Sequence, residues 1–117
     1  MHETAIAMDI CETARSHVPP GHRLVAVVVE YGPLSGIIPE ALDFGFSIAA
    51  GHFDLDSAKL EARLVPADAE CPLCGESFRM KTMWDECPSC GHAPVTVREG
   101  GRELRLKEIK VKESADV

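Results

Sequence analysis

The sequence has no hydrophobic run long enough to cross a bilayer, and it lacks the start of a secretory signal. None of its apolar stretches approaches the roughly 18 residues that a membrane-spanning helix needs. The first residues do not combine a basic region with an apolar stretch, which a secretory signal requires. We therefore predict a cytoplasmic protein with no membrane partner.

Basic and aromatic residues are also scarce. The 117 residues carry 12 Lys and Arg against 19 Asp and Glu, for a net charge of −7, and aromatic residues make up 5%. Nucleic-acid-binding proteins usually present a basic surface and aromatic rings for base stacking, so this composition argues against such a partner. The excess of acidic over basic residues is concentrated in residues 1–69, which hold 4 basic and 10 acidic side chains. This imbalance suits cations or a basic protein partner, and it is equally compatible with a role in solubility alone.

No arrangement typical of catalysis is present in the sequence. It offers no pair of carboxylates at a recognisable spacing, no nucleophile with a nearby base and no phosphate-binding loop. We therefore predict that the protein is not an enzyme.

Hydrophobic periodicity predicts two helices and a small sheet. Apolar residues spaced by four predict a helix over 3–17, and a second helix begins at about Pro39, which suits a first helical turn. Strands are expected at 24–30, 58–65, 95–97 and 103–111. Gly100-Gly101 is interpreted as a hairpin turn between the last two strands. The predicted fold class is α+β, with two helices packed on a three-stranded sheet built from the first, second and last of these strands.

The core-facing residues of the two helices follow from the same spacing. Ile6, Ile10, Ala14 and Val18 form the expected stripe of the first helix. Leu42, Phe46 and Ala49 form that of the second, and Gly51 is placed to end it. Cys11 lies within the first helix, where a lone cysteine is typically a small buried hydrophobe.

Four of the five cysteines form two copies of one sequence motif, Cys-x-x-Cys-Gly. Cys71-Pro-Leu-Cys74-Gly75 and Cys87-Pro-Ser-Cys90-Gly91 each allow a tight turn that aims two sulfurs at one ion. Two such knuckles facing each other form a closed site of four sulfurs, which is the structural zinc arrangement. Iron in a rubredoxin-like carrier uses the same ligands and stays a chemical alternative, as do disulfides or a redox dithiol.

The segment that carries these cysteines differs in composition from its flanks. We predict that residues 70–93 form a small zinc-binding domain, with Ser77–Met80 as one arm of a short hairpin between the knuckles. Residues 1–69 and 94–117 would form the surrounding α+β domain. A segment this small cannot bury enough core to order itself, so the metal would supply the missing free energy.

The amino terminus offers a second possible metal site. The amine of Met1, the amide nitrogen and imidazole of His2, and the carboxylate of Glu3 can together place nitrogens and an oxygen around one ion. A planar set of nitrogens suits Ni(II) or Cu(II). The positive end of the helix dipole opposes a cation there, so such a site should hold its metal loosely. On these residues alone, a solvent-exposed histidine without a function is the alternative.

Several segments together resemble the HypA/HybF family of nickel-insertion accessory proteins. They are Met1-His2-Glu3, Pro39-Glu40-Ala41-Leu42-Asp43-Phe44-Gly45-Phe46, the two Cys-x-x-Cys-Gly knuckles and Gly101-Arg102-Glu103-Leu104-Arg105-Leu106-Lys107. The resemblance implies that the protein is a nickel metallochaperone of [NiFe]-hydrogenase maturation. It also implies nickel bound by His2 with Glu3 contributing, and structural zinc on Cys71, Cys74, Cys87 and Cys90. The implied partners are the GTPase HypB and the hydrogenase large subunit, with urease maturation factors for some relatives.

One function of another class remains open at this point. The knuckles by themselves also suit a zinc-ribbon module that binds a protein or a nucleic acid. The roles of Glu40, on the second helix, and His92, directly after the second knuckle, are not determined by the sequence.

Overall fold

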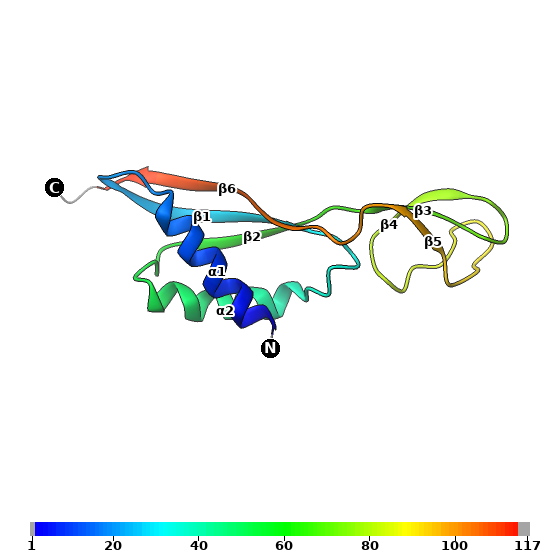
Figure 1. Cartoon of the computed structure of the whole chain (residues 1–117), viewed down its shortest axis with the longest axis horizontal. Coiled ribbons are helices and arrows are strands. Elements are labelled where there is room, and N and C mark those ends of the chain that lie inside the picture. The colour runs from blue at the N-terminus through cyan, green and yellow to red at the C-terminus, as the bar shows by residue number, and fades with distance from the viewer. Residues whose placement is uncertain (1, 115–117) are drawn as a thin grey trace. The chain divides into compact units, whose positions relative to one another are not determined.

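The computed structural model describes the backbone of residues 2–114 and the side chains of residues 3–114. In chain order the elements are α1 (His2–Ser16), β1 (His22–Tyr31), α2 (Pro39–His52), β2 (Lys59–Leu64), β3 (Ala67–Glu70), β4 (Ser77–Met80), β5 (Thr96–Glu99) and β6 (Leu104–Glu113) (Figure 1). They form two three-stranded sheets, one of order β2-β1-β6 and one of order β4-β3-β5. The predicted α+β class is confirmed.

The described residues divide into two compact units. The helical unit comprises residues 2–29, 38–62 and 106–114, and the knuckle unit comprises residues 30–37 and 63–105. All four cysteines of the knuckles lie in the knuckle unit, which extends well beyond the cysteine-rich segment on both sides. None of the helices in the described part of the chain is both long and apolar enough to cross a membrane.

The helical unit is organised around β1, the central strand of its sheet. Ala26, Val27, Val28 and Val29 are all at most 5% exposed, so the strand is covered on both faces as its continuous apolar run predicts. On the two flanking strands, Lys110 of β6 and Glu61 of β2 form a salt bridge with an N–O distance of 3.1 Å. Because β1 lies between β2 and β6, this pair links the two edge strands across the central strand.

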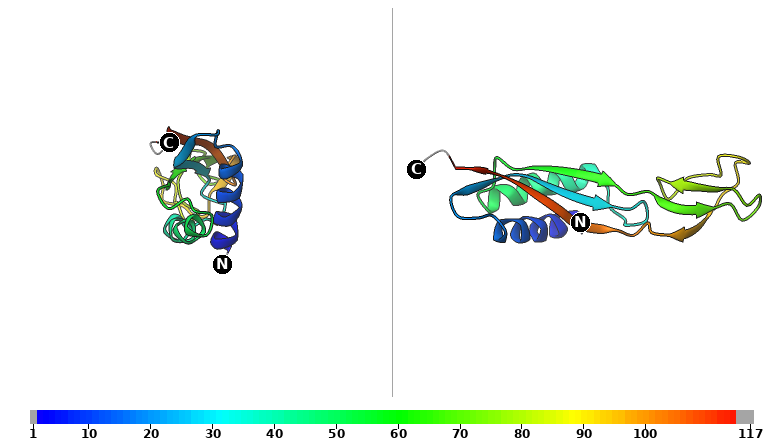
Figure 2. Two further views of the ribbon diagram at one scale, coloured as in Figure 1. Left: turned by 90° about the vertical axis from the view of Figure 1, so that its left-hand side faces the viewer. Right: turned by 90° about the horizontal axis from the view of Figure 1, so that it is seen from above.

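Both helices lie on the same side of this sheet (Figures 1 and 2). The buried face of α1 consists of Glu3, Ala7, Ile10, Cys11 and Ala14. The prediction that Ile6 belongs to this face is therefore wrong, because Ile6 is only half-buried while Ala7 and Cys11 are fully covered. The small residues are favoured where α2 approaches closely.

Gly45 is the residue of α2 that permits this approach. A Cβ atom at position 45 would lie 3.2 Å from the carbonyl oxygen of Glu3 and 3.5 Å from the Cβ of Ala7. Contacts with backbone atoms this short cannot be relieved by turning a side chain, so the helices would have to separate. A glycine within the helix costs about 1 kcal/mol relative to alanine, and close packing of the two helices offsets that cost.

The helix α2 begins at Pro39 as predicted, and its core residues Leu42, Phe46 and Ala49 are buried. The prediction that Gly51 ends the helix is wrong. The helix continues to His52, the N–H of Phe53 donates to the carbonyl of Ala49, and Asp54 instead adopts the positive φ that follows a helix end. An aspartate tolerates this conformation better than most residues do.

The sheet of the knuckle unit has a pairing that the sequence does not reveal. The strand β3 pairs antiparallel with β4, with Ala67 opposite Met80 and Glu70 opposite Ser77. The predicted arm Ser77–Met80 is therefore a strand, but its hairpin encloses the first knuckle and does not lie between the two knuckles. The sequence does not predict β3, because Pro66 directly before it indicates the end of a strand.

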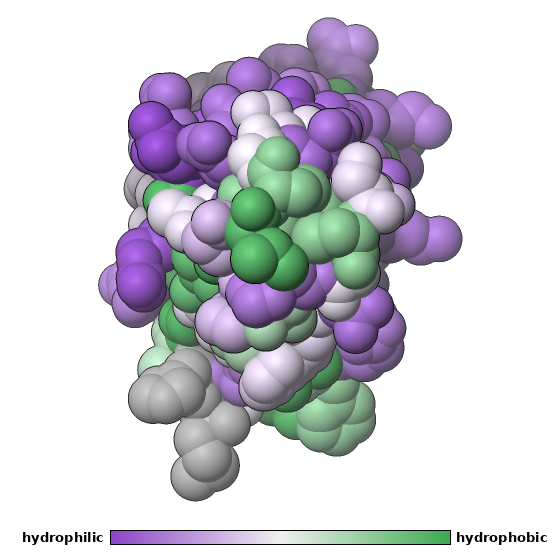
Figure 3. All heavy atoms as spheres, turned by 90° about the vertical axis from the view of Figure 1, so that its right-hand side faces the viewer, coloured by the Kyte–Doolittle hydropathy of each residue, from purple (hydrophilic) through white to green (hydrophobic). Residues whose placement is uncertain are grey.

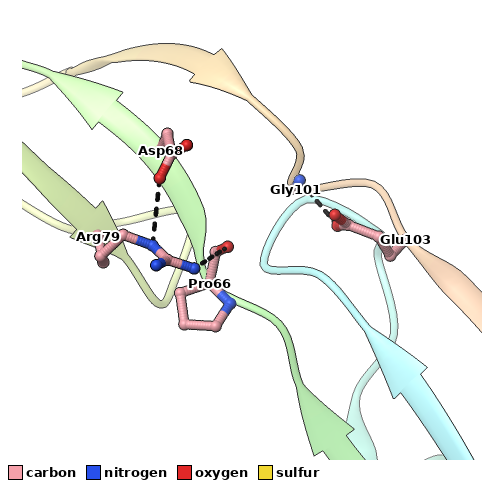
Figure 4. A network of polar contacts seen from close by, with 5 residues as sticks. All are labelled: Pro66, Asp68, Arg79, Gly101 and Glu103. Atoms are coloured by element: carbon pink, nitrogen blue, oxygen red, sulfur yellow. Dashed lines mark hydrogen bonds and ion pairs between the residues drawn. The ribbon is translucent and has the colours of Figure 1, made fainter.

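The prediction of a hairpin at Gly100-Gly101 is wrong. The strand β5 pairs with β3, whereas β6 joins the other sheet beside β1. Both glycines have positive φ, but they lead the chain alongside the segment that follows β1: the carbonyl of Gly101 accepts from the N–H of Leu34 and that of Glu103 from the N–H of Gly32. The Glu103 carboxylate also accepts a hydrogen bond of 2.8 Å from the N–H of Gly101 (Figure 4).

The apolar core of the knuckle unit is small. Its buried residues are Ala67, Ala69 and Met80, and the partly buried residues packed against them are Leu34, Phe78, Val95 and Val97. On the surface, the Arg79 side chain pairs with Asp68 at 3.2 Å and donates to the carbonyl of Pro66 (Figure 4). An exposed pair of this kind contributes at most about 1 kcal/mol. The unit therefore has few internal sources of stability.

Candidate metal centres

The first knuckle is a tight turn built on the sulfur of Cys71. The N–H groups of Leu73 and Cys74 donate to this sulfur at 3.3 and 3.4 Å. The N–H of Gly75 donates to the carbonyl of Cys71, and the N–H of Cys71 donates to the carbonyl of Glu76. Gly75 has a φ of 81°, a conformation that favours glycine, which explains its position directly after the second cysteine.

The second knuckle repeats this hydrogen bonding. The N–H groups of Ser89 and Cys90 donate to the sulfur of Cys87 at 3.4 and 3.5 Å. The N–H of Gly91, whose φ is 77°, donates to the carbonyl of Cys87, and the N–H of Cys87 donates to the carbonyl of His92. His92 thus contributes to the knuckle through its backbone.

The four sulfurs of the two knuckles converge on one point. The Sγ atoms of Cys71 and Cys90 are 3.6 Å apart, those of Cys74 and Cys87 are 3.5 Å apart, and all four lie within 4.8 Å of one another. A tetrahedral zinc with Zn–S bonds of about 2.3 Å places its sulfurs about 3.8 Å apart, so the spacing fits such an ion. All four cysteines are free, and a disulfide would need sulfurs about 2.05 Å apart. The cluster thus fits a metal held by four cysteines, as in a structural zinc site.

Backbone hydrogen bonds prepare Cys71 to be a thiolate. The N–H groups of Cys74 and Leu73, together with hydrogen bonds from the thiols of Cys90 and Cys74, lower the pKa of Cys71 to about 6, although burial of the thiol opposes this shift. Cys71 and Cys87 are buried beneath the turns, and Cys74 and Cys90 are exposed. Since a metal binds the deprotonated sulfur, N–H groups aimed at a buried sulfur favour the ligating form.

The end of the knuckle unit presents apolar side chains to solvent. Figure 3 shows hydrophobic spheres gathered near the centre of this face, with hydrophilic residues around them. Leu73, between the cysteines of the first knuckle, is 70% exposed, and Trp84, in the loop between the knuckles, is 81% exposed. The Trp84 loop is ordered by Asp85, whose carboxylate accepts hydrogen bonds from the hydroxyl of Thr82 and the N–H of Lys81.

The predicted site at the amino terminus is only partly visible. Met1 and the side chain of His2 lie outside the described residues. Glu3 is described and is only 8% exposed. Its Oε2 accepts a hydrogen bond of 3.4 Å from the N–H of Ile38, the N-cap residue of α2, which has no side-chain cap of its own.

The surroundings of Glu3 favour its charged form. Hydrogen bonds from its own backbone N–H and from that of Ile38 lower the pKa of the Glu3 carboxyl, while burial opposes the shift. The carboxylate also lies where the positive end of the α2 dipole favours a negative charge. Sequence reasoning missed this contact because the two residues are 35 positions apart; the only signal was a helix beginning at Pro39 without a capping side chain before it.

Two other residues considered from the sequence, Cys11 and Glu40, have structural roles outside the four-cysteine cluster. Cys11 is fully buried on α1 as predicted, and burial raises the pKa of its thiol to about 11, so it is an inert hydrophobe. Glu40 is exposed in the first turn of α2, where its charge suits the helix dipole.

Comparison with known proteins identifies the family. The family described as hydrogenase/urease nickel incorporation, metallochaperone, HypA matches residues 1–111. The hydrogenase maturation factor HypA of Geobacter sulfurreducens is 39% identical over 111 residues, which cover 95% of this chain and 99% of that protein. HypA 2 of Bradyrhizobium diazoefficiens is 36% identical over 115 residues, with the same coverage of both chains.

Solved structures agree in fold. The solution structure of the Ni metallochaperone HypA from Helicobacter pylori matches with a TM-score of 0.57 at 19% identity, covering 97% of this chain and 98% of that one. A second solution structure of a HypA protein matches with a TM-score of 0.54. Identities this low show likeness of fold only, whereas the family match covers nearly the whole sequence. The chain therefore belongs to the HypA family of metallochaperones that act in nickel incorporation into hydrogenase.

Proposed function

We propose that this chain binds Ni(II) at its amino terminus and delivers it during [NiFe]-hydrogenase maturation. The ligands would be the imidazole of His2 and nitrogens of the terminal backbone, including the amine of Met1, with Glu3 contributing. The observation that carries this proposal is the family match, which includes residues 1–3. Nickel is the cargo of this protein and not a resident cofactor.

The position of Glu3 supports a loosely held cargo. The carboxylate is largely buried and accepts a hydrogen bond from Ile38, so it ties the start of α1 to the start of α2. A negative charge fixed there offsets part of the unfavourable field that two helix N-termini exert on a cation. A site at a helix N-terminus remains weak compared with one enclosed by ligands, which suits a protein that must release its metal.

In the knuckle unit, we propose that Cys71, Cys74, Cys87 and Cys90 hold structural zinc. The sulfur spacing and the paired N–H groups of each knuckle support this assignment. Four cysteines leave no open coordination position for water, so the zinc would stabilise the unit and perform no chemistry. Iron is the outcome that metal analysis and visible absorption would reveal instead.

The protein would act by binding and transfer, with no catalytic step of its own. Its proposed partners are a HypB-type GTPase, the hydrogenase large subunit and, as for some relatives, urease maturation factors. We place this activity in the cytoplasm. Functionally, residues 1–69 and 94–117 would form the nickel-binding domain and residues 70–93 the zinc-binding domain.

Nickel titration of the wild type beside His2→Ala tests the proposal, with zinc measured in both. We expect the variant to lose nickel binding and hydrogenase maturation while keeping zinc. His17→Ala is the matched control, because His17 is exposed near the other end of α1 and bonds the carbonyl of Thr13. A residue added before Met1 should also weaken binding by moving the amine. Unchanged nickel stoichiometry in His2→Ala would show that the cargo site lies elsewhere.

A further inference from the structure

An apolar strip lies exposed along α2. Ala41, Phe44 and Ile48 are spaced by three or four residues and so share one side of the helix, and Ile38 is the N-cap residue directly before it. Phe44 is 70% exposed, Ile38 58% and Ile48 53%, and Ala41 is half-buried. We call these four residues the docking strip. Large apolar side chains that stay exposed side by side mark sites of protein interaction.

The exposure of the strip does not result from poor packing of α2. On the opposite side of the same helix, Leu42 and Ala49 are completely buried and Phe46 is 2% exposed. The helix therefore has one apolar face that is buried within its own unit, where Gly45 packs against α1, and a second apolar face that stays exposed. Phe44 and Phe46 lie two residues apart on these two faces.

The charges that flank the strip are acidic. The exposed carboxylates of the two helices are Asp9, Glu12, Glu40 and Asp43. The helix α2 contains no lysine or arginine. The one basic residue of α1, Arg15, stacks on the ring of Phe53 with its guanidinium carbon 4.7 Å from the ring centroid. An apolar surface in this setting selects a partner that carries positive charge.

We propose that the docking strip binds a basic amphipathic segment of a protein partner. Apolar side chains of that segment would cover Phe44 and Ile48, and its lysines or arginines would meet carboxylates such as Glu40 and Asp43. The biological role of the strip rests on the proposed function, since the partner would be a component of the maturation pathway. Peptide binding itself does not depend on nickel.

The test uses the purified full-length protein and a fluorescent synthetic peptide of leucine and lysine arranged with helical spacing. A peptide of the same composition in scrambled order measures attraction by charge alone. The double variant Phe44→Ser, Ile48→Ser should weaken binding of the patterned peptide at least about tenfold, and Glu40→Gln, Asp43→Asn should reduce its salt dependence. Val111→Ser, at an exposed apolar position on β6, is the matched control.

Four results would count against the proposal. Equal binding of both peptides would mean that charge alone attracts them and that the apolar strip contributes nothing. Unchanged binding by the double variant would mean that the peptide binds at another surface. Self-association of the wild type that the double variant loses would identify a second copy of this chain as the occupant. In cells, the double variant should lose hydrogenase maturation while keeping nickel binding, an outcome distinct from that of His2→Ala; wild-type maturation would likewise count against the strip.

Discussion

Removing the metal from the four cysteines should unfold the knuckle unit and leave the helical unit folded. The largest buried side chain in the small apolar core of the knuckle unit is that of Met80, whose burial is worth about 1.5–3 kcal/mol, and the other two core residues are alanines. Structural zinc on cysteine ligands supplies about 10–16 kcal/mol in small metal-binding peptides. The metal term therefore exceeds anything the core of this unit offers. The helical unit has its own core around β1 and contains none of these ligands.

Hydrogen exchange distinguishes local unfolding of the knuckle unit from unfolding of the whole chain or of neither unit. In the loaded protein the N–H groups of Gly75 and Gly91 are bonded within the knuckles and should be protected. After chelation, or in Cys74→Ser, a loss of about 4 kcal/mol of local stability would raise their exchange rates about a thousandfold. Cys11→Ala is the matched control, because that cysteine lies outside the cluster. Protection that persists in the metal-free knuckles, or that disappears equally from residues 24–29 of β1, would refute this reasoning.

Two further predictions concern the helical unit. Phe46→Ala should lower the free energy of unfolding by about 3–5 kcal/mol, since Phe46 is buried. Phe44→Ala should change it by no more than about 0.5 kcal/mol, because Phe44 is exposed. Similar urea midpoints for the two variants would contradict the assignment of the two faces of α2. The lowered pKa of Glu3 means that its contribution to stability is present above its ordinary value of 4.5 and is lost as pH falls through the lower pKa of the folded state. Glu3→Gln should thus be less stable than the wild type near neutral pH, with a difference that shrinks in acid. A difference independent of pH would exclude the charge of Glu3 as its cause.

Much of the architecture was predictable because its signals are local. The valine run of β1, the proline that opens α2 and the stripe Leu42, Phe46 and Ala49 each report their environment through neighbouring residues. The wrong predictions concern residues whose local pattern suggests one structure but which have another role in the folded protein. Gly100-Gly101 has the composition of a hairpin turn, but both glycines instead carry the chain past the segment that follows β1.

The amino-acid sequence by itself determined the four-cysteine cluster, because the spacing within each knuckle dictates the turn that aims its sulfurs. It also determined the two helices through apolar periodicity and the central strand through a continuous apolar run. Only the tertiary structure decided that β3 pairs with both β4 and β5 and that the Glu3 carboxylate accepts a hydrogen bond from the N–H of Ile38. It also decided that one side of α2 is left exposed. These features depend on residues far apart in the chain, whose meeting is set by packing and not by any local pattern.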